Sequence, residues 1–469
     1  MVLGSLLDVW DHVNPFPPKN KAKLMPMEML KSFSIVKNGN IILSTATGKG
    51  HLHCLTGMRS ISMCWIIYGH LYLLGQFLGY SKSVENRKLV EDIALGKAGT
   101  GYLILLNAFP AVDTFFFMSG TLVAYLTFPA FDKKKFDLAM FYIHRYIRLT
   151  IPLAFYIAFE AAFAGYMTYG PIFDTSASID HCRNTGWRNI LYINNFFKFD
   201  EACLGQTWYL ANDMQFYILS PFIMYPIWKR PKYGVMGAVT IYALLTILIG
   251  TITYEYQIPP SNGFPFSQPT DFDMSTHFYA APYIRFQPYL IGILLGYLLY
   301  KTKSKEVRIP HGLNIVMWQL SLLTMYLVIF GISTLLEDDS PTGHSWNSFQ
   351  SIMYNCFSKT GWSLALAWIV FSCQKGYGGV VNSFLSWKAW IPMSKLTYGA
   401  YLIHITCQQI VLFGSSYALH FTDFMMVKQF PILITCILIL TLCISFLVYL
   451  LYWNCLLCLW SFICSVTKC

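Results

Sequence analysis

Long apolar runs separated by short polar segments recur along most of this chain. Each run is long enough for an α-helix to cross a hydrocarbon core, which takes about 20 residues at about 1.5 Å per residue. The pattern therefore predicts an all-α, polytopic membrane protein with about ten transmembrane helices. The predicted spans are residues 60–79, 107–128, 149–170, 207–228, 233–254, 282–300, 312–336, 350–373, 396–416 and 430–463.

The polar segments between the runs differ in charge. Lysine and arginine gather after the second, fourth, sixth and eighth predicted spans, whereas the segment 254–279 contains neither. Cytosolic connections retain basic residues, so this alternation predicts that both termini are cytosolic. We expect a basic cytosolic lead-in at 1–58, a membrane domain at 59–463 and a short tail at 464–469.

Composition supports a membrane protein. The 469 residues are 55% hydrophobic, 17% aromatic and only 12% charged, whereas soluble proteins average about 25% charged residues. The formal charge of +10 does not indicate a nucleic-acid partner, because the basic residues lie between apolar runs and no nucleic-acid motif is present. The expected partner is a lipid bilayer, either the plasma membrane or an endomembrane.

The 13 cysteines show no zinc-binding spacing, so no metal site is expected. Cys182 and Cys203 share one predicted extracytoplasmic segment and are the only cysteines between Cys64 and Cys356. Because that compartment is oxidising, we predict a disulfide between them. Two free thiols are the alternative.

The first predicted span carries an arginine and a histidine in the stretch RSISMCWIIYGH, residues 59–70. Eleven residues make about three helical turns, so Arg59 and His70 share one face and lie roughly 16 Å apart along it. An ionisable side chain in a membrane is costly unless it faces the protein interior or a wet cavity. His70 is therefore a candidate site residue, and the alternative is a hydrogen-bonded packing residue.

Two further arginines lie at the start of the third predicted span, in YIHRYIRL, residues 142–149. Arg145 and Arg148 are three residues apart, so they share a helical face. Together with Arg59 they could bind a phosphate-bearing cofactor, because guanidinium groups bind phosphate through paired hydrogen bonds. Anchoring against lipid headgroups is the alternative.

The second predicted span contains a carboxylate and a pair of small residues, in NAFPAVDTFFFMSG, residues 107–120. Asp113 could orient or charge-stabilise an imidazole such as that of His70. Ser119 and Gly120 permit close approach, either of a substrate or of a neighbouring helix.

Three more polar side chains fall within later spans. Asp213 and Arg285 are expected near the same side of the membrane, where they form either a structural ion pair or part of a substrate site. His404 is expected about 12 Å into the membrane from the cytosolic side.

Five motifs in order resemble the membrane-bound acyltransferase 3 superfamily. They are the Arg-x10-His of the first span, FFFMSG, Arg-x-x-Arg, WYLANDMQFY and TYGAYLIH. The stretches YINNF, residues 192–196, and YLANDMQFYILSP are similar to the animal branch named for resistance of the nose to fluoxetine. Each motif alone is weak, but their order across about 400 residues is specific.

The resemblance implies a ten-helix core that transfers an acyl group, often acetyl, from cytosolic acyl-CoA to a hydroxyl acceptor at or across the membrane. It implies that Arg59, Arg145 and Arg148 bind the donor and that His70 is the base. Asp213 stands where many bacterial relatives have glutamate. The alternative function is a lipid or xenobiotic transporter without acyl transfer, in which buried charges line a path.

Overall fold

The computed structural model describes residues 34–48, 50–80, 84–94, 99–164, 166, 175–260, 272–333, 347–413 and 420–423. Within these ranges the chain is helical and contains no β-strand, as the apolar runs predict. The tenth predicted span at 430–463, the tail at 464–469 and most of the lead-in at 1–58 lie outside the described residues.

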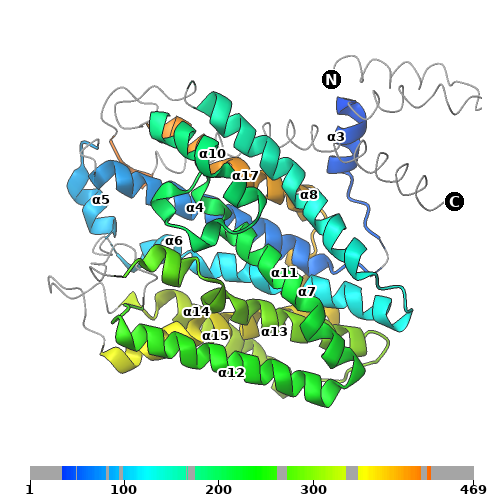
Figure 1. The fold of residues 1–469 in the computed structure, drawn as a ribbon. Helices are drawn as coiled ribbons and strands as arrows, with labels where there is room; N and C mark the ends of the chain where they lie inside the picture. Colours follow the sequence, from blue (N-terminus) through cyan, green and yellow to red (C-terminus); the bar gives the residue numbers. More distant parts are fainter. Residues whose placement is uncertain are drawn as a thin grey trace, which may run out of the picture.

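Nine long helices of the described chain overlap the first nine predicted spans, and they lie side by side as a bundle (Figure 1). They are α4 (His53–Tyr80), α7 (Phe109–Asp132), α8 (Leu138–Phe159), α11 (Trp208–Lys229), α12 (Pro231–Glu255), α13 (Pro282–Lys301), α14 (His311–Phe330), α15 (Ser348–Gln374) and α17 (Trp390–Phe413).

Four of the described helices are long and apolar enough to cross a membrane: α7, α8 with its continuation to Phe163, α12 and α14. The helix α15 and the short α16 (Gly379–Leu385) form a pair bent by 91°, which would make a fifth. The other long helices carry polar side chains within them, such as His70 in α4 and Asp213 in α11. The chain is a membrane protein, while the count of about ten spans stays a prediction.

Shorter helical segments connect the long ones. The described part of the segment between α8 and α11 is largely helical, and we call its residues 175–207 the connecting cap. The short elements are α3 (Ile35–Leu43), α5 (Arg87–Ala94), η1 (Thr100–Tyr102), α6 (Leu103–Leu106), the π-helix η2 (Glu160–Ala164), α10 (Thr175–Ile190), η3 (Asn194–Phe196), η4 (Phe199–Glu201), η5 (Gly205–Thr207) and the π-helix η6 (Ser275–Tyr279).

The helix α8 begins earlier than the sequence predicts. Asp137 caps its start by accepting hydrogen bonds from the backbone N–H groups of Ala139 (2.9 Å) and Met140 (3.2 Å). A side chain at this position supplies acceptors for N–H groups that have no partner within the helix. The predicted start at 149 is therefore too late, and Arg145 and Arg148 lie within the helix rather than at its end.

The helices α7 and α13 pack closely through small residues. A Cβ atom on Gly120 would collide with the carbonyl oxygen of Tyr289, and one on Gly292 would collide with that of Phe117. Gly292 and Gly296 have the G-x-x-x-G spacing that lets membrane helices approach backbone to backbone. Gly120 is thus a packing residue, which is the structural alternative that the sequence left open.

Candidate functional site

Three helices converge on Arg145 of α8. Its Nη2 atom forms an ion pair with the carboxylate of Asp213 on α11 and lies 3.4 Å from the Oγ atom of Ser119 on α7. Its guanidinium group lies 4.1 Å from the centre of the Tyr217 ring, within range of a cation–π interaction. Because the Asp213 side chain is only 6% exposed, this ion pair lies within the bundle.

Arg59 lies within electrostatic range of the same carboxylate and of Arg148. Arg59 of α4 is half-buried and interacts electrostatically with Arg148, Tyr209 and Asp213, and Arg148 is exposed. The structure therefore brings the three predicted arginines into one neighbourhood, in which Arg145 pairs with Asp213 and Arg59 lies within electrostatic range of both Asp213 and Arg148. We call these four residues the arginine cluster, and it carries three positive charges against one negative charge.

A row of aromatic rings leads away from the arginine cluster. The ring centres of Tyr209 and Tyr401 lie 5.6 Å apart, those of Tyr401 and His404 6.3 Å apart, and those of His404 and His70 5.1 Å apart. We call these four residues the aromatic column. It connects α11, which carries Tyr209, to the two histidines of α17 and α4.

The two histidines make matching hydrogen bonds. The Nδ1 atom of His70 lies 2.9 Å from the carbonyl oxygen of Ile66, and that of His404 lies 2.8 Å from the carbonyl oxygen of Tyr401. A carbonyl oxygen only accepts, so each Nδ1 donates, and the Nε2 atom of a neutral ring keeps its lone pair. His404 is fully buried, whereas His70 is partly exposed.

A second charged group surrounds Arg285 of α13. Its Nη1 atom lies 3.1 Å and 3.4 Å from the two carboxylate oxygens of Asp113 on α7. Its Nε atom donates a hydrogen bond of 2.9 Å to the carbonyl oxygen of Tyr279. The guanidinium group also lies 4.9 Å from the Tyr279 ring and 5.4 Å from the Trp208 ring. Arg285 is fully buried, so these contacts replace only part of its water shell.

These contacts correct two sequence-based hypotheses. The ion pair between Asp213 and Arg285 is wrong, because Asp213 pairs with Arg145 and Arg285 pairs with Asp113. The structure also places Asp113 on Arg285 rather than on His70. Helical periodicity predicts which residues face the interior, but it does not predict which interior residues meet.

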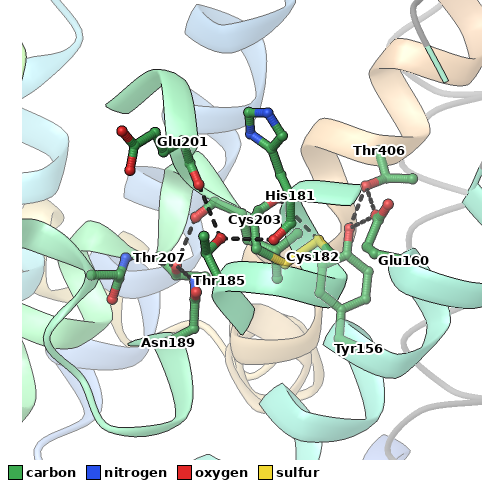
Figure 2. Close-up of a disulfide and its surroundings, with 12 residues drawn as sticks. Tyr156, Glu160, His181, Cys182, Thr185, Asn189, Glu201, Cys203, Thr207 and Thr406 are labelled. Carbon is green, nitrogen blue, oxygen red and sulfur yellow. Dashed lines mark hydrogen bonds between the residues drawn. A yellow bond between two sulfur atoms is a disulfide. The ribbon is translucent and has the colours of Figure 1, made fainter. Parts of the chain in front are cut away.

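The disulfide between Cys182 and Cys203 is confirmed (Figure 2). It closes the connecting cap, whose α10 packs against α8 and η2. Thr185 adds hydrogen bonds to the carbonyl oxygens of His181 (2.7 Å) and Glu201 (2.9 Å). The amide of Asn189 donates to the Oγ1 atom of Thr207 at 2.6 Å. Thr207 directly precedes α11, so the cap is tied to the helix that carries Asp213.

Sequence reasoning missed a buried carboxylate in η2, the π-helix that packs against α10 of the cap. Glu160 begins the π-helix η2 and is 5% exposed. It accepts a hydrogen bond of 2.7 Å from the Tyr156 hydroxyl and another from Thr406 of α17 (Figure 2). A single glutamate within the apolar run 151–166 is the signal that could have identified it, and π-helical turns often mark functional sites.

Comparison with known proteins places the chain in a family. Residues 52–450 match the acyltransferase domain. The chain is 31% identical over 431 residues to nose resistant to fluoxetine protein 6 of Caenorhabditis elegans. The aligned residues cover 87% of this chain and 51% of the relative. The chain is 23% identical over 410 residues to regulator of hypoxia-inducible factor 1 of the same organism, covering 81% of this chain and 75% of the relative. No solved structure matches.

The chain thus spans about half the length of the first of these relatives. The matched range contains the arginine cluster, the aromatic column and the Asp113–Arg285 ion pair. It also contains each of the five motifs on which the resemblance rests. That resemblance is confirmed: this chain belongs to the membrane-bound acyltransferase 3 family.

Proposed function

We propose that this protein is an integral membrane acyltransferase. It moves an acyl group, acetyl in the simplest case, from cytosolic acyl-CoA to a hydroxyl group of an acceptor at or across the membrane. The observation that carries this proposal is the aromatic column, which links the arginine cluster to the partly exposed His70.

The arginine cluster fits the phosphate groups of the donor. The cluster contains three guanidinium groups and one carboxylate, so a surplus of positive charge is left for a phosphate to balance. Two buried polar atoms of the cluster, Nε of Arg145 and Oδ1 of Asp213, have no hydrogen-bond partner among the described residues. Buried polar atoms are normally paired. The N–H at Nε of Arg145 is therefore a donor available to a phosphate oxygen, and the acceptor Oδ1 of Asp213 is available to water.

Arg59 and His70 set the distance between the donor's phosphates and its thioester. They occupy one face of α4, roughly 16 Å apart along the helix. The pantetheine arm of acyl-CoA would extend along this face from the arginine cluster toward His70. Arg59 and Arg148 therefore bind the donor, while His70 acts at the reacting carbonyl.

His70 supplies the proton transfer. Its Nε2 atom accepts the proton of the acceptor hydroxyl while the hydroxyl oxygen attacks the thioester carbonyl. The new C–O bond forms, the C–S bond breaks, and the imidazolium returns its proton to the departing thiolate. A positioned base of this kind typically contributes about 10² to 10⁴ in rate. His404 packs edge-on against the His70 ring and holds its orientation.

The proposal is tested with purified protein in nanodiscs and radiolabelled acetyl-CoA. We expect His70→Ala to bind the donor normally but to lose about 10² to 10⁴ in acetyl transfer or hydrolysis. We expect Arg148→Ala to weaken donor binding. Matched controls are His311→Ala and Arg230→Ala, because both residues are exposed on the bundle surface, and both variants should behave as wild type.

Two results decide against the proposal. If wild-type protein neither binds nor consumes acetyl-CoA, the proposal that the protein is an acyltransferase is wrong. If His70→Ala turns over normally, the assignment of the base fails. Uptake of a lipid or a xenobiotic by proteoliposomes that lack acyl-CoA would then favour the transporter.

A further inference from the structure

The helices α7, α13 and α15 enclose three charged side chains that the proposed acyl transfer does not use. Asp113, Arg285 and Lys359 are 3%, 0% and 4% exposed, respectively. Lys359 lies within electrostatic range of both Arg285 and Asp113. Two cations therefore face one carboxylate inside the bundle, which leaves one positive charge without a counterion among the described residues.

Arg285 and Lys359 also lack hydrogen-bond partners for some of their donor atoms. The Nη1 and Nε atoms of Arg285 are used by Asp113 and Tyr279, but its buried Nη2 atom has no hydrogen-bond partner within the described chain. The described residues also offer no hydrogen bond or ion pair to the ammonium group of Lys359. The Nζ atom of Lys359 lies 5.8 Å from the centre of the Phe278 ring.

An arrangement of this kind is costly without a ligand. A buried charge is tolerated when it is paired and hydrogen-bonded, and leaving one unpaired costs several kcal/mol. Cation–π contacts with Phe278, Trp208 and Tyr279 offset only part of that cost. A negatively charged ligand between Arg285 and Lys359 would supply both side chains with a hydrogen-bond acceptor and a counterion.

We propose that Arg285 and Lys359 form a buried subsite for one carboxylate group. A single negative charge balances the surplus. The free edge of a guanidinium group matches a planar carboxylate, and a lysine adds a point charge beside it. The aromatic rings of Phe278, Trp208 and Tyr279 surround this charge with apolar surface, which favours a carboxylate attached to an apolar body.

The subsite is separate from the arginine cluster. Asp113 and Ser119 are six residues apart on α7, which places the two groups roughly 9 Å apart along that helix. The inference therefore does not depend on acyl transfer. The carboxylate could belong to a small acid from the aqueous phase or to a fatty acid from the membrane, and the two sources are distinguished by experiment.

The test measures the thermal stability of the protein in nanodiscs as sodium acetate replaces sodium chloride at constant ionic strength. We expect a saturable rise in Tm for wild-type protein. Lys359→Met should weaken the apparent affinity by about 10- to 100-fold, the usual effect of losing a charged hydrogen bond. Lys359→Arg, which keeps the charge, should retain binding, and so should the control Lys232→Met on the exposed face of α12.

The variant Lys359→Met should still fold, so its loss of binding can be measured. Replacing an unpaired buried cation by an apolar side chain of similar length is often neutral or stabilising, so Lys359→Met without acetate should be at least as stable as wild type. Decanoate gives the second arm: tighter Lys359-dependent binding than acetate assigns the carboxylate to a membrane fatty acid, and equal or weaker binding assigns it to an aqueous acid.

Two outcomes would overturn the proposal. The first is that the Tm of wild-type protein does not rise as acetate replaces chloride, which would mean that the group selects no carboxylate and holds an adventitious ion only. The second is that Lys359→Met responds to acetate as wild type does.

Discussion

Removing the disulfide should release the connecting cap without unfolding the bundle. Cys182 and Cys203 are 21 residues apart. Closing a loop of this length lowers the conformational entropy of the unfolded segment, which stabilises the folded cap by about 3 kcal/mol at 25 °C. The double variant Cys182→Ser/Cys203→Ser loses this restriction. Opening of the cap should therefore become easier by about 3 kcal/mol, which is about 10²-fold in its opening equilibrium.

The effect should stay local because the cap keeps other hydrogen bonds and the long helices pack against one another without it. Asn189 and Asn194 both donate hydrogen bonds to Thr207, at 2.6 Å and 3.1 Å. These bonds do not depend on the disulfide, and the packing of α11 against α7 and α12 does not involve the cap. The long helices should therefore keep their stability while the cap opens more often.

Hydrogen exchange followed by mass spectrometry measures this directly in nanodiscs. Peptides covering residues 181–204 should exchange about 10²-fold faster in the double variant, and peptides of α12 should not change. Cys356→Ser is the matched control, because Cys356 is a buried free cysteine of α15. Unchanged exchange in the cap, or equal acceleration throughout the bundle, would refute the reasoning.

Two further variants test the packing and the charges of the bundle. Asp113→Asn leaves Arg285 and Lys359 buried without a carboxylate, so the free energy of unfolding should fall by about 3–5 kcal/mol in thermal unfolding. The control Asp132→Asn, at an exposed position of the same helix, should lose much less stability. Equal losses in the two variants would contradict this account. Gly120→Leu should prevent α7 from approaching α13 and reduce the yield of folded protein in size-exclusion chromatography. Its control, Gly237→Leu, meets open space on α12, and a similar loss there would show that close packing is not the cause.

Local sequence determined most of the secondary structure. Runs of about 20 apolar residues predicted nine helices that overlap those of the described structure, because a helix that satisfies its own backbone hydrogen bonds is the stable form of such a run in a membrane. The disulfide was also predictable, since only two cysteines share the segment. The start of α8 was missed because its first turns are polar and are stabilised by the Asp137 cap instead of by apolar length.

The sequence also identified most of the charged residues that the structure brings together. Arg59, Arg145, Arg148 and His70 stand out because ionisable groups are rare in apolar runs. The same argument applies to Glu160 and Lys359, which were overlooked although each is a lone charge within such a run. The residue types and their helical faces were thus available before the fold was known.

Only the tertiary structure decided which of these groups meet. Asp113 and Arg285 are 172 residues apart, Arg145 and Asp213 are 68 apart, and the His70 and His404 rings meet across α4 and α17. Every interior helix face follows the same period, so the pattern along one helix contains no information about its neighbour. Close contacts such as Gly120 against α13 select the neighbours and their register, and that register places each carboxylate beside its particular arginine.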